Sequence, residues 1–135
     1  MTNKMIASLA AAAALFSTSA LAEVVVVVNP KAAESAMTKE QVAQFFLGKS
    51  SAMTPVDQAD ASPVRAEFYK KVAGKDAAQA KALWSKLVFT GKATMPKEVA
   101  DSAAVKAAVA ANPKAIGYID KGAVDGSVKV VYTAQ

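Results

Sequence analysis

The sequence has 135 residues and a formal net charge of +5, from 16 basic and 11 acidic side chains that are dispersed along the chain. It contains no cysteine and no histidine, which excludes disulfides, a cysteine nucleophile, a Ser-His-Asp triad and the usual zinc sites. No aromatic–basic motif of a nucleic-acid-binding domain occurs. The neighbouring carboxylates Asp57 and Asp60 have no identifiable partner group for acid–base chemistry. We therefore expect no enzyme, no catalytic residues, no cofactor, no metal ion and no nucleic acid.

The first 22 residues have the pattern of an export signal. Lys4 precedes the apolar run MIASLAAAAALF, and a small-x-small site ends at Ala22. This order predicts a signal peptide that is cleaved after Ala22, and the run is too short for a confident membrane span. We expect residues 1–22 to be the signal peptide and residues 23–135 to form one periplasmic domain without a membrane span.

The mature chain opens with EVVVVVN at 23–29, an uninterrupted β-branched run that predicts a central strand buried on both faces. Thr38 and Gln41 then form a capping-box pattern, which predicts a helix that ends near Gly48. The loop that follows contains Ser50 and Ser51. Their hydroxyls can donate to an anion, although serines in such loops more often form turns.

Residues 55–74 predict a short strand, a polar loop and a helix. Ser62 is a suitable N-cap, Pro63 fits the first helical position, and Gly74 ends the helix. The backbone N–H groups at this helix start, the helix dipole and the nearby Arg65 together form a candidate anion site. An ordinary capped helix packed on a sheet explains the same residues, and on these residues alone it is the preferred interpretation.

Asp76 predicts the start of a helix that runs through Phe89. Its expected apolar stripe consists of Ala80, Leu83, Trp84, Leu87 and Val88. Residues 90–96 are irregular, with glycine and proline as breakers. Thr90 and Lys92 in this segment are candidates to face a ligand.

A further helix is expected from Asp101 or Ser102 to about residue 111. A strand over 115–119 follows, in which a glycine allows close backbone approach. A turn over 120–127 and a last strand over 128–133 complete the chain. This order of elements predicts a three-layer α/β domain rather than a helical bundle.

Three segments, in this order, resemble parts of the phosphate-binding proteins of ABC transporters. TKEQVAQFFLGKSSAM resembles a helix and loop that follow a crossing strand, VDQADASPVRAEFYKKV resembles the strand–loop–helix ligand motif, and NPKAIGYID resembles a late strand. The resemblance implies a single lobe of a type 2 periplasmic-binding-protein fold, with a mixed central sheet flanked by helices. It begins where the family chain crosses into its second lobe, and the family's first lobe has no counterpart in this sequence.

The resemblance places the ligand loop at residues 58–64, where the family's usual run is similar to R-x-D-G-S-G-T. Asp60 and Ser62 match this run, and Arg65 matches an arginine that some relatives carry just after it. Four positions depart from the run: Gln58, Ala61, Pro63 and Val64. The resemblance thus implies weak binding of phosphate, chiefly through Asp60, Ser62 and Arg65. Further candidates for ligand binding are Ser50, Ser51, Thr90 and Lys92.

Two functions remain open from the sequence. The first is an exported solute-binding-like domain, linked to phosphate ABC transport, that binds a small oxyanion weakly. The second is a periplasmic protein-interaction or sensor-partner module without its own ligand, which could also associate with a second copy of itself. An exposed apolar patch at Phe45, Phe46 or Trp84 would favour the second function. A polar, positively charged hollow at Ser62 and Arg65 would favour the first.

Overall fold

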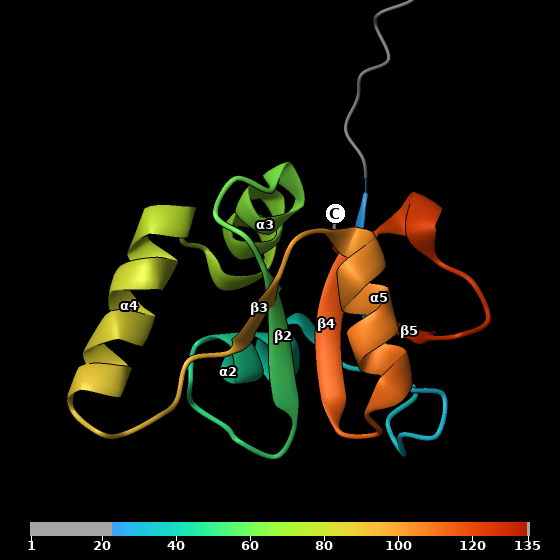
Figure 1. Ribbon diagram of the computed structural model, residues 1–135, viewed down its shortest axis with the longest axis horizontal. Coiled ribbons are helices and arrows are strands. Elements are labelled where there is room, and N and C mark those ends of the chain that lie inside the picture. The colour runs from blue at the N-terminus through green and yellow to red at the C-terminus, as the bar shows by residue number, and fades with distance from the viewer. Residues whose placement is uncertain (1–22, 135) are drawn as a thin grey trace, which may run out of the picture.

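A computed structural model describes residues 23–134, in which one mixed sheet lies between two layers of helices (Figure 1). The elements in chain order are β1 (Val24–Val28), α2 (Lys39–Phe46), β2 (Thr54–Gln58), α3 (Pro63–Phe68), the π-helix η2 (Tyr69–Ala73), α4 (Ala77–Phe89), β3 (Lys97–Val99), α5 (Ser102–Ala111), β4 (Ala115–Asp120), the 3₁₀ turn η3 (Lys121–Ala123) and β5 (Lys129–Ala134). The predicted signal peptide lies outside the described residues. Within residues 23–134, no helix has the length and apolar character needed to cross a membrane.

The sheet has five strands in the order β3-β2-β4-β1-β5. β2 runs parallel to β3 and β4, whereas β1 runs antiparallel to β4 and β5. Helices connect the parallel strands, so the carboxyl ends of β2, β3 and β4 lie at one edge of the sheet. In open α/β sheets, ligands bind outside this edge. The three-layer α/β architecture predicted from the sequence is confirmed.

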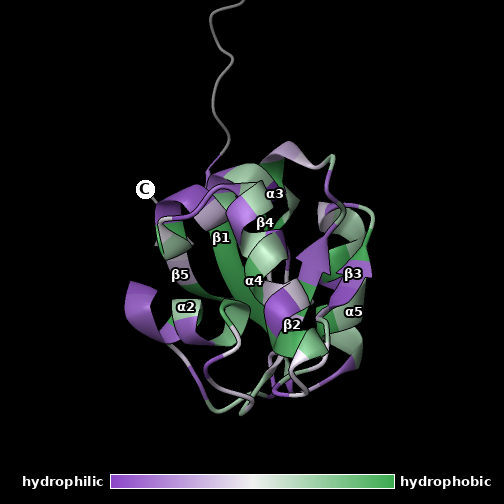
Figure 2. Ribbon diagram, turned by 90° about the vertical axis from the view of Figure 1, so that its left-hand side faces the viewer, coloured by the Kyte–Doolittle hydropathy of each residue, from purple (hydrophilic) through white to green (hydrophobic). Residues whose placement is uncertain are grey.

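β1 lies between β4 and β5, and each of its five valines is at most 2% exposed. Alternate side chains face opposite sides of the sheet. Val24, Val26 and Val28 join the core beneath α2 and α3, while Val25 and Val27 join the core beneath α5. Figure 2 shows β1 as a continuously hydrophobic ribbon inside the molecule. Burial of each valine contributes about 1.5–3 kcal/mol, and the predicted strand is confirmed.

An aromatic cluster fills the core on the α2 and α3 side of the sheet. The rings of Phe68 and Tyr118 stack with their centroids 4.0 Å apart, and Phe46 meets the ring of Phe68 edge-on at 4.7 Å. Trp84 of α4 donates its indole N–H to the carbonyl of Phe46 at 2.8 Å. Phe45, Phe46 and Trp84 are only 8%, 0% and 4% exposed. These three residues therefore do not form the exposed patch that would have favoured an interaction module.

Helix α5 covers the other face of the sheet. The Asp101 carboxylate caps its first turn by accepting from the N–H of Ala104 at 3.0 Å. Val105 and Val109, both fully buried, pack over Gly117 of β4. Because Gly117 has no side chain, α5 lies close to β4. This close packing sets the position of the first turn of α5 at the carboxyl edge of the sheet.

Three details differ from the sequence prediction. Strand β3 was not expected, because its sequence KEV has little intrinsic strand preference and its order comes from pairing with β2. The helix predicted to end at Gly74 changes from α to π geometry at Tyr69, and Gly74 ends it at φ 68°. Helix α4 lies past the edge strand β3 in Figure 1, and only Ala80 and Trp84 of its expected apolar stripe are buried.

Candidate functional site

A cavity of about 590 Å³ opens at the carboxyl ends of β2 and β4. Its walls come from the loop after β2, the first turns of α3 and α5, and the turn after β4. The polar side chains on these walls belong to Gln58, Ser62, Asp101, Ser102 and Asp120. We call this hollow the carboxyl-edge cavity. It brings together residues more than 60 positions apart in the chain, and among these polar residues only Ser62 is one of the seven predicted ligand-binding residues.

Gln58 connects the elements around the carboxyl-edge cavity. Its side-chain amide donates to the carbonyl of Tyr118 at 2.9 Å and to the hydroxyl of Ser102 at 3.3 Å. Its amide oxygen accepts from the hydroxyl of Ser62 at 2.6 Å. The side chain is fully buried, so the neutral residue at the family's arginine position ties the start of α3 to β4 and α5. From the sequence alone, Gln58 is only one of four departures from the family's run.

The rim of the carboxyl-edge cavity combines helix caps with the backbone N–H groups at the start of α5. Ser62 caps α3 by accepting from the N–H of Arg65 at 3.3 Å. The first N–H groups of α5 have no acceptor within the helix, and Ser102 and Ala103 at this helix start line the cavity. The carboxylates of Asp101 and Asp120 also line it, and no lysine or arginine among residues 23–134 does so. The site can therefore hold a polar solute through hydrogen bonds, without a cation.

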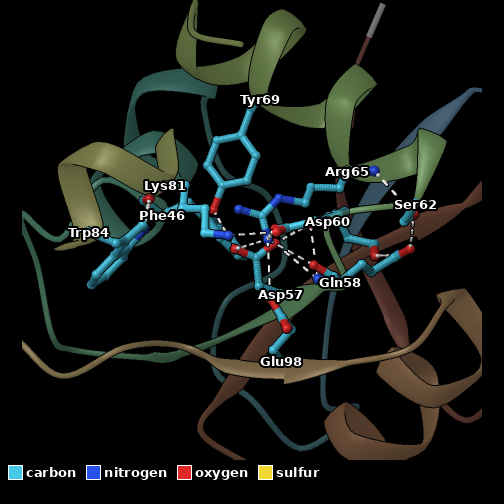
Figure 3. Close-up of polar contacts among 11 residues, drawn as sticks. Phe46, Asp57, Gln58, Asp60, Ser62, Arg65, Tyr69, Lys81, Trp84 and Glu98 are labelled. Carbon is cyan, nitrogen blue, oxygen red and sulfur yellow. Dashed lines mark hydrogen bonds and ion pairs between the residues drawn. The ribbon is translucent and has the colours of Figure 1, made fainter. Parts of the chain in front are cut away.

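Arg65, the only arginine of the chain, lies outside this cavity and is 4% exposed. Its Nη1 donates to the carbonyl of Gln58 at 2.9 Å and lies 3.4 Å from a carboxylate oxygen of Glu98 (Figure 3). Carboxylate oxygens of Asp57 and Asp60 lie 3.6 Å and 3.5 Å from the same nitrogen. Burial by itself lowers the pKa of Arg65, but the Asp57 carboxylate and the nearby tyrosines raise it above its ordinary value. The Nη1 atom is thus occupied by the protein's own acceptors, while the buried Nε of Arg65 has no hydrogen-bond partner among residues 23–134.

Asp57 is the buried acceptor of this cluster, at 4% exposure. Tyr69 donates its hydroxyl to Asp57 at 2.6 Å, and Tyr118 donates to the other carboxylate oxygen. Burial raises the pKa of both tyrosines, and the charge of Asp57 raises it further. Asp60 is exposed and pairs with Lys81 at 2.8 Å, which lowers the pKa of Asp60. The hydrogen bonds and ion pairs of Asp57 and Asp60 link β2 to α3, η2 and α4.

A second cavity, of about 490 Å³, lies at the other end of β2. It contains three of the additional candidates, Ser50, Ser51 and Lys92, together with Lys49 and Lys97, which sequence analysis had missed. We call it the basic cavity. Thr90 does not line it, because its hydroxyl donates to the carbonyl of Lys86 at 2.9 Å at the end of α4.

The seven predicted site residues thus lie in separate places. Ser62 lines the carboxyl-edge cavity, Asp60 and Arg65 lie in the neighbouring ion-pair cluster, and three others line the basic cavity. Their roles as ligand-binding residues stay predictions. Over the part of the chain that the structure describes, no group of three His, Cys, Asp or Glu residues is placed to hold a metal ion.

No protein-family model matches the sequence, and a search of curated proteins finds no match. Solved structures do match. An ABC-type phosphate transport receptor from Vibrio cholerae superposes with a TM-score of 0.64 and 21% identity, over 82% of this chain and 45% of that protein. The fold is one lobe of the type 2 periplasmic-binding-protein fold. The lobe predicted from the sequence resemblance is therefore confirmed as a fold.

Two further structures agree with this assignment of the fold. A phosphate ABC transporter substrate-binding protein from Clostridium perfringens, solved with bound phosphate, matches with a TM-score of 0.64 and 23% identity over 82% of this chain and 44% of that one. PstS from Borrelia burgdorferi matches with a TM-score of 0.63 and 13% identity over 82% and 47%. The chain spans less than half the length of each of these proteins.

Proposed function

We propose that this chain is an exported, periplasmic solute-binding-like domain, linked to phosphate ABC transport, that holds a small oxyanion such as phosphate weakly in the carboxyl-edge cavity. The observation that carries the proposal is the position of this cavity. It lies outside the carboxyl ends of β2 and β4 and beside the start of α5, where open α/β sheets bind their ligands. The fold shared with phosphate-binding proteins supports phosphate as the first oxyanion to test.

The chemistry of the rim argues for weak binding. Backbone N–H groups at the start of α5 can donate to an oxyanion, and the helix dipole adds a favourable charge. The carboxylates of Asp101 and Asp120 repel a fully ionised anion, but either can accept a hydrogen bond from a protonated phosphate oxygen. Because the cavity is open and no lysine or arginine of the described residues lines it, its contacts remain hydrated and bring little net free energy. Binding should strengthen as the pH falls and phosphate gains a proton.

Calorimetric titration with inorganic phosphate tests this function. Ala103 is exposed, lines the cavity and lies in the first turn of α5. Ala103→Glu brings a negative charge to the site, and the same charge interacts favourably with the helix start, so this variant should remain folded. Ala103→Gln is the matched control of almost the same size. We expect weak saturable heat from the wild type and the glutamine variant, and none from the glutamate variant.

Either of two results would contradict the proposal. One is the absence of saturable heat at millimolar phosphate from the wild-type protein. The other is equal binding by Ala103→Glu and Ala103→Gln, which would place any bound phosphate elsewhere on the molecule.

The second candidate function is a protein-interaction module. The exposed small residues Ala61, Ala100 and Ala103 on the rim of the carboxyl-edge cavity favour it, because they leave room for another protein surface to approach the backbone. In this function the serine and aspartate caps are purely structural. Sedimentation over a range of concentrations checks for self-association, and dissociation of a dimer by Ala103→Glu would favour this candidate over phosphate binding.

A further inference from the structure

The basic cavity has the charge and the shape of a second, different ligand site. It lies between the loop before β2 and the loop before β3, at the end of β2 opposite the carboxyl-edge cavity. Three exposed lysines surround it: Lys49, Lys92 and Lys97. Hydroxyl groups of Ser50, Ser51, Thr54 and Thr94 add donors to the same walls. No carboxylate among residues 23–134 lines this cavity.

The three lysines are not neutralised by any carboxylate of residues 23–134. Within the described part of the chain, no carboxylate oxygen lies within 4.0 Å of the Nζ atom of Lys49, Lys92 or Lys97, whereas Lys81 pairs with Asp60 at 2.8 Å. Three like charges around one hollow repel one another, and an anion placed between them relieves this repulsion. Neutralisation thus has to come from solvent ions or from a ligand.

The floor of the basic cavity is apolar and fixed in place. Phe45, Met53 and Trp84, which form part of it, are 8%, 5% and 4% exposed. The hydrogen bond from the Trp84 indole to the carbonyl of Phe46 holds that ring in position. Met95 also lines the cavity and is 52% exposed. A preformed apolar floor beneath a few polar groups is typical of small-molecule sites, and an aromatic wall suits a ring or a short alkyl chain.

We infer that the basic cavity binds a small organic anion, one that combines a phosphate, sulfate or carboxylate group with a ring or a short alkyl part. The lysines and hydroxyls receive the charged group, and the floor of Phe45, Met53 and Trp84 receives the apolar part. This site differs from the carboxyl-edge cavity in its position, its net charge and the class of its ligand. It does not depend on the function proposed for that cavity.

Titration with phenyl phosphate tests this inference. Trp84 is the only tryptophan of the chain, so its fluorescence reports directly on the cavity, and calorimetry provides a second readout. The test variant is Lys92→Gln/Lys97→Gln. The control is Lys39→Gln/Lys70→Gln, which removes the same charge from exposed positions outside both cavities. One exposed charge contact changes affinity by up to about fivefold. Because the test variant removes two such contacts, we expect it to bind phenyl phosphate about tenfold more weakly than the wild type. The control variant should change the affinity by less than about twofold.

The absence of a saturable response at millimolar phenyl phosphate would overturn the inference, and so would equal binding by the test and control variants. Equal affinity for inorganic phosphate would also overturn it, because the apolar floor would then have no role. The Ala103→Glu variant separates the two sites. Phenyl phosphate binding that persists in Ala103→Glu supports a ligand in the basic cavity, and its loss would place the ligand in the carboxyl-edge cavity and overturn the inference.

Discussion

Gly117 is the position where one added methyl group should show how tightly α5 packs on the sheet. A Cβ atom at this position would lie 2.4 Å from Cγ1 of Val105 and 3.2 Å from Cγ2 of Val109. Carbon atoms pack best at about 3.5–4.0 Å. Gly117→Ala therefore requires α5, or the side chain of Val105, to move by about 1 Å.

The cost follows from the lack of free space around this contact. Val105 and Val109 are fully buried, and forcing an extra methyl group into a well-packed core costs about 1–3 kcal/mol. Replacing a strand glycine with alanine returns about 0.5–1 kcal/mol. We expect Gly117→Ala to lower the free energy of unfolding by about 1–2 kcal/mol. In a domain of this size, that loss lowers Tm by about 4–8 °C.

Urea unfolding followed by Trp84 fluorescence measures this loss. Gly126→Ala is the matched control, because a Cβ at Gly126 meets no atom within 4 Å, and it should change stability by less than about 0.5 kcal/mol. Val105→Ala removes the clashing Cγ1 atom, so the double variant Gly117→Ala/Val105→Ala should lose less stability than the sum of the single variants. Equal urea midpoints for Gly117→Ala and Gly126→Ala would refute the close packing of α5 on β4.

Two other predictions concern the buried polar cluster. Arg65→Met leaves the Asp57 carboxylate buried without its guanidinium partner and should lower the free energy of unfolding by about 3–5 kcal/mol. Lys81→Met breaks only an exposed ion pair and should lower it by less than about 1 kcal/mol. Equal urea midpoints for the two variants would contradict the structural role of Arg65. Because the pKa values of Tyr69 and Tyr118 are raised in the folded protein, their contribution to stability is fully present below the ordinary tyrosine pKa of about 10. Above that pH it should fall by up to about 2.7 kcal/mol per pH unit for the pair. Ultraviolet titration should show these tyrosines ionising only as the protein unfolds, and their ionisation in the folded protein would disprove the shift.

The parts of the fold that could be predicted carry their own local signals. The run of valines in β1 is apolar on both faces of the strand and predicts burial on both sides. Thr38, Ser62 and Asp76 each cap the helix that follows them, as predicted, and Asp101 is the cap among the two residues predicted for α5. β3 has no such signal, because only its pairing with β2 makes it a strand. The switch from α to π geometry at Tyr69 also lacks a local signal.

The candidate site was harder to predict than the fold. Arg65 follows Ser62 closely in the sequence, and that proximity suggested a shared anion site. The acceptors beside the Nη1 atom of Arg65 include Asp57 and Glu98, which are 8 and 33 positions away in the chain and come near it only through the sheet. A single sequence shows that a charge is present, but not which other charges it meets. Gln58 was undervalued for the same reason, since three of its partners come from other elements.

The placement of charge gives the two ends of β2 different chemistry. At the carboxyl end, the only arginine lies beside carboxylates, and the cavity offers neutral donors together with the carboxylates of Asp101 and Asp120. Within residues 23–134, phosphate binding there involves no attraction to a lysine or arginine that salt could screen. At the amino end, three lysines that form no ion pair within residues 23–134 line the basic cavity. Attraction between exposed charges is screened over about 8 Å at physiological salt. Repeating both titrations at higher salt should therefore weaken phenyl phosphate binding much more than phosphate binding. A single anion site shared by both ligands would lose both affinities together.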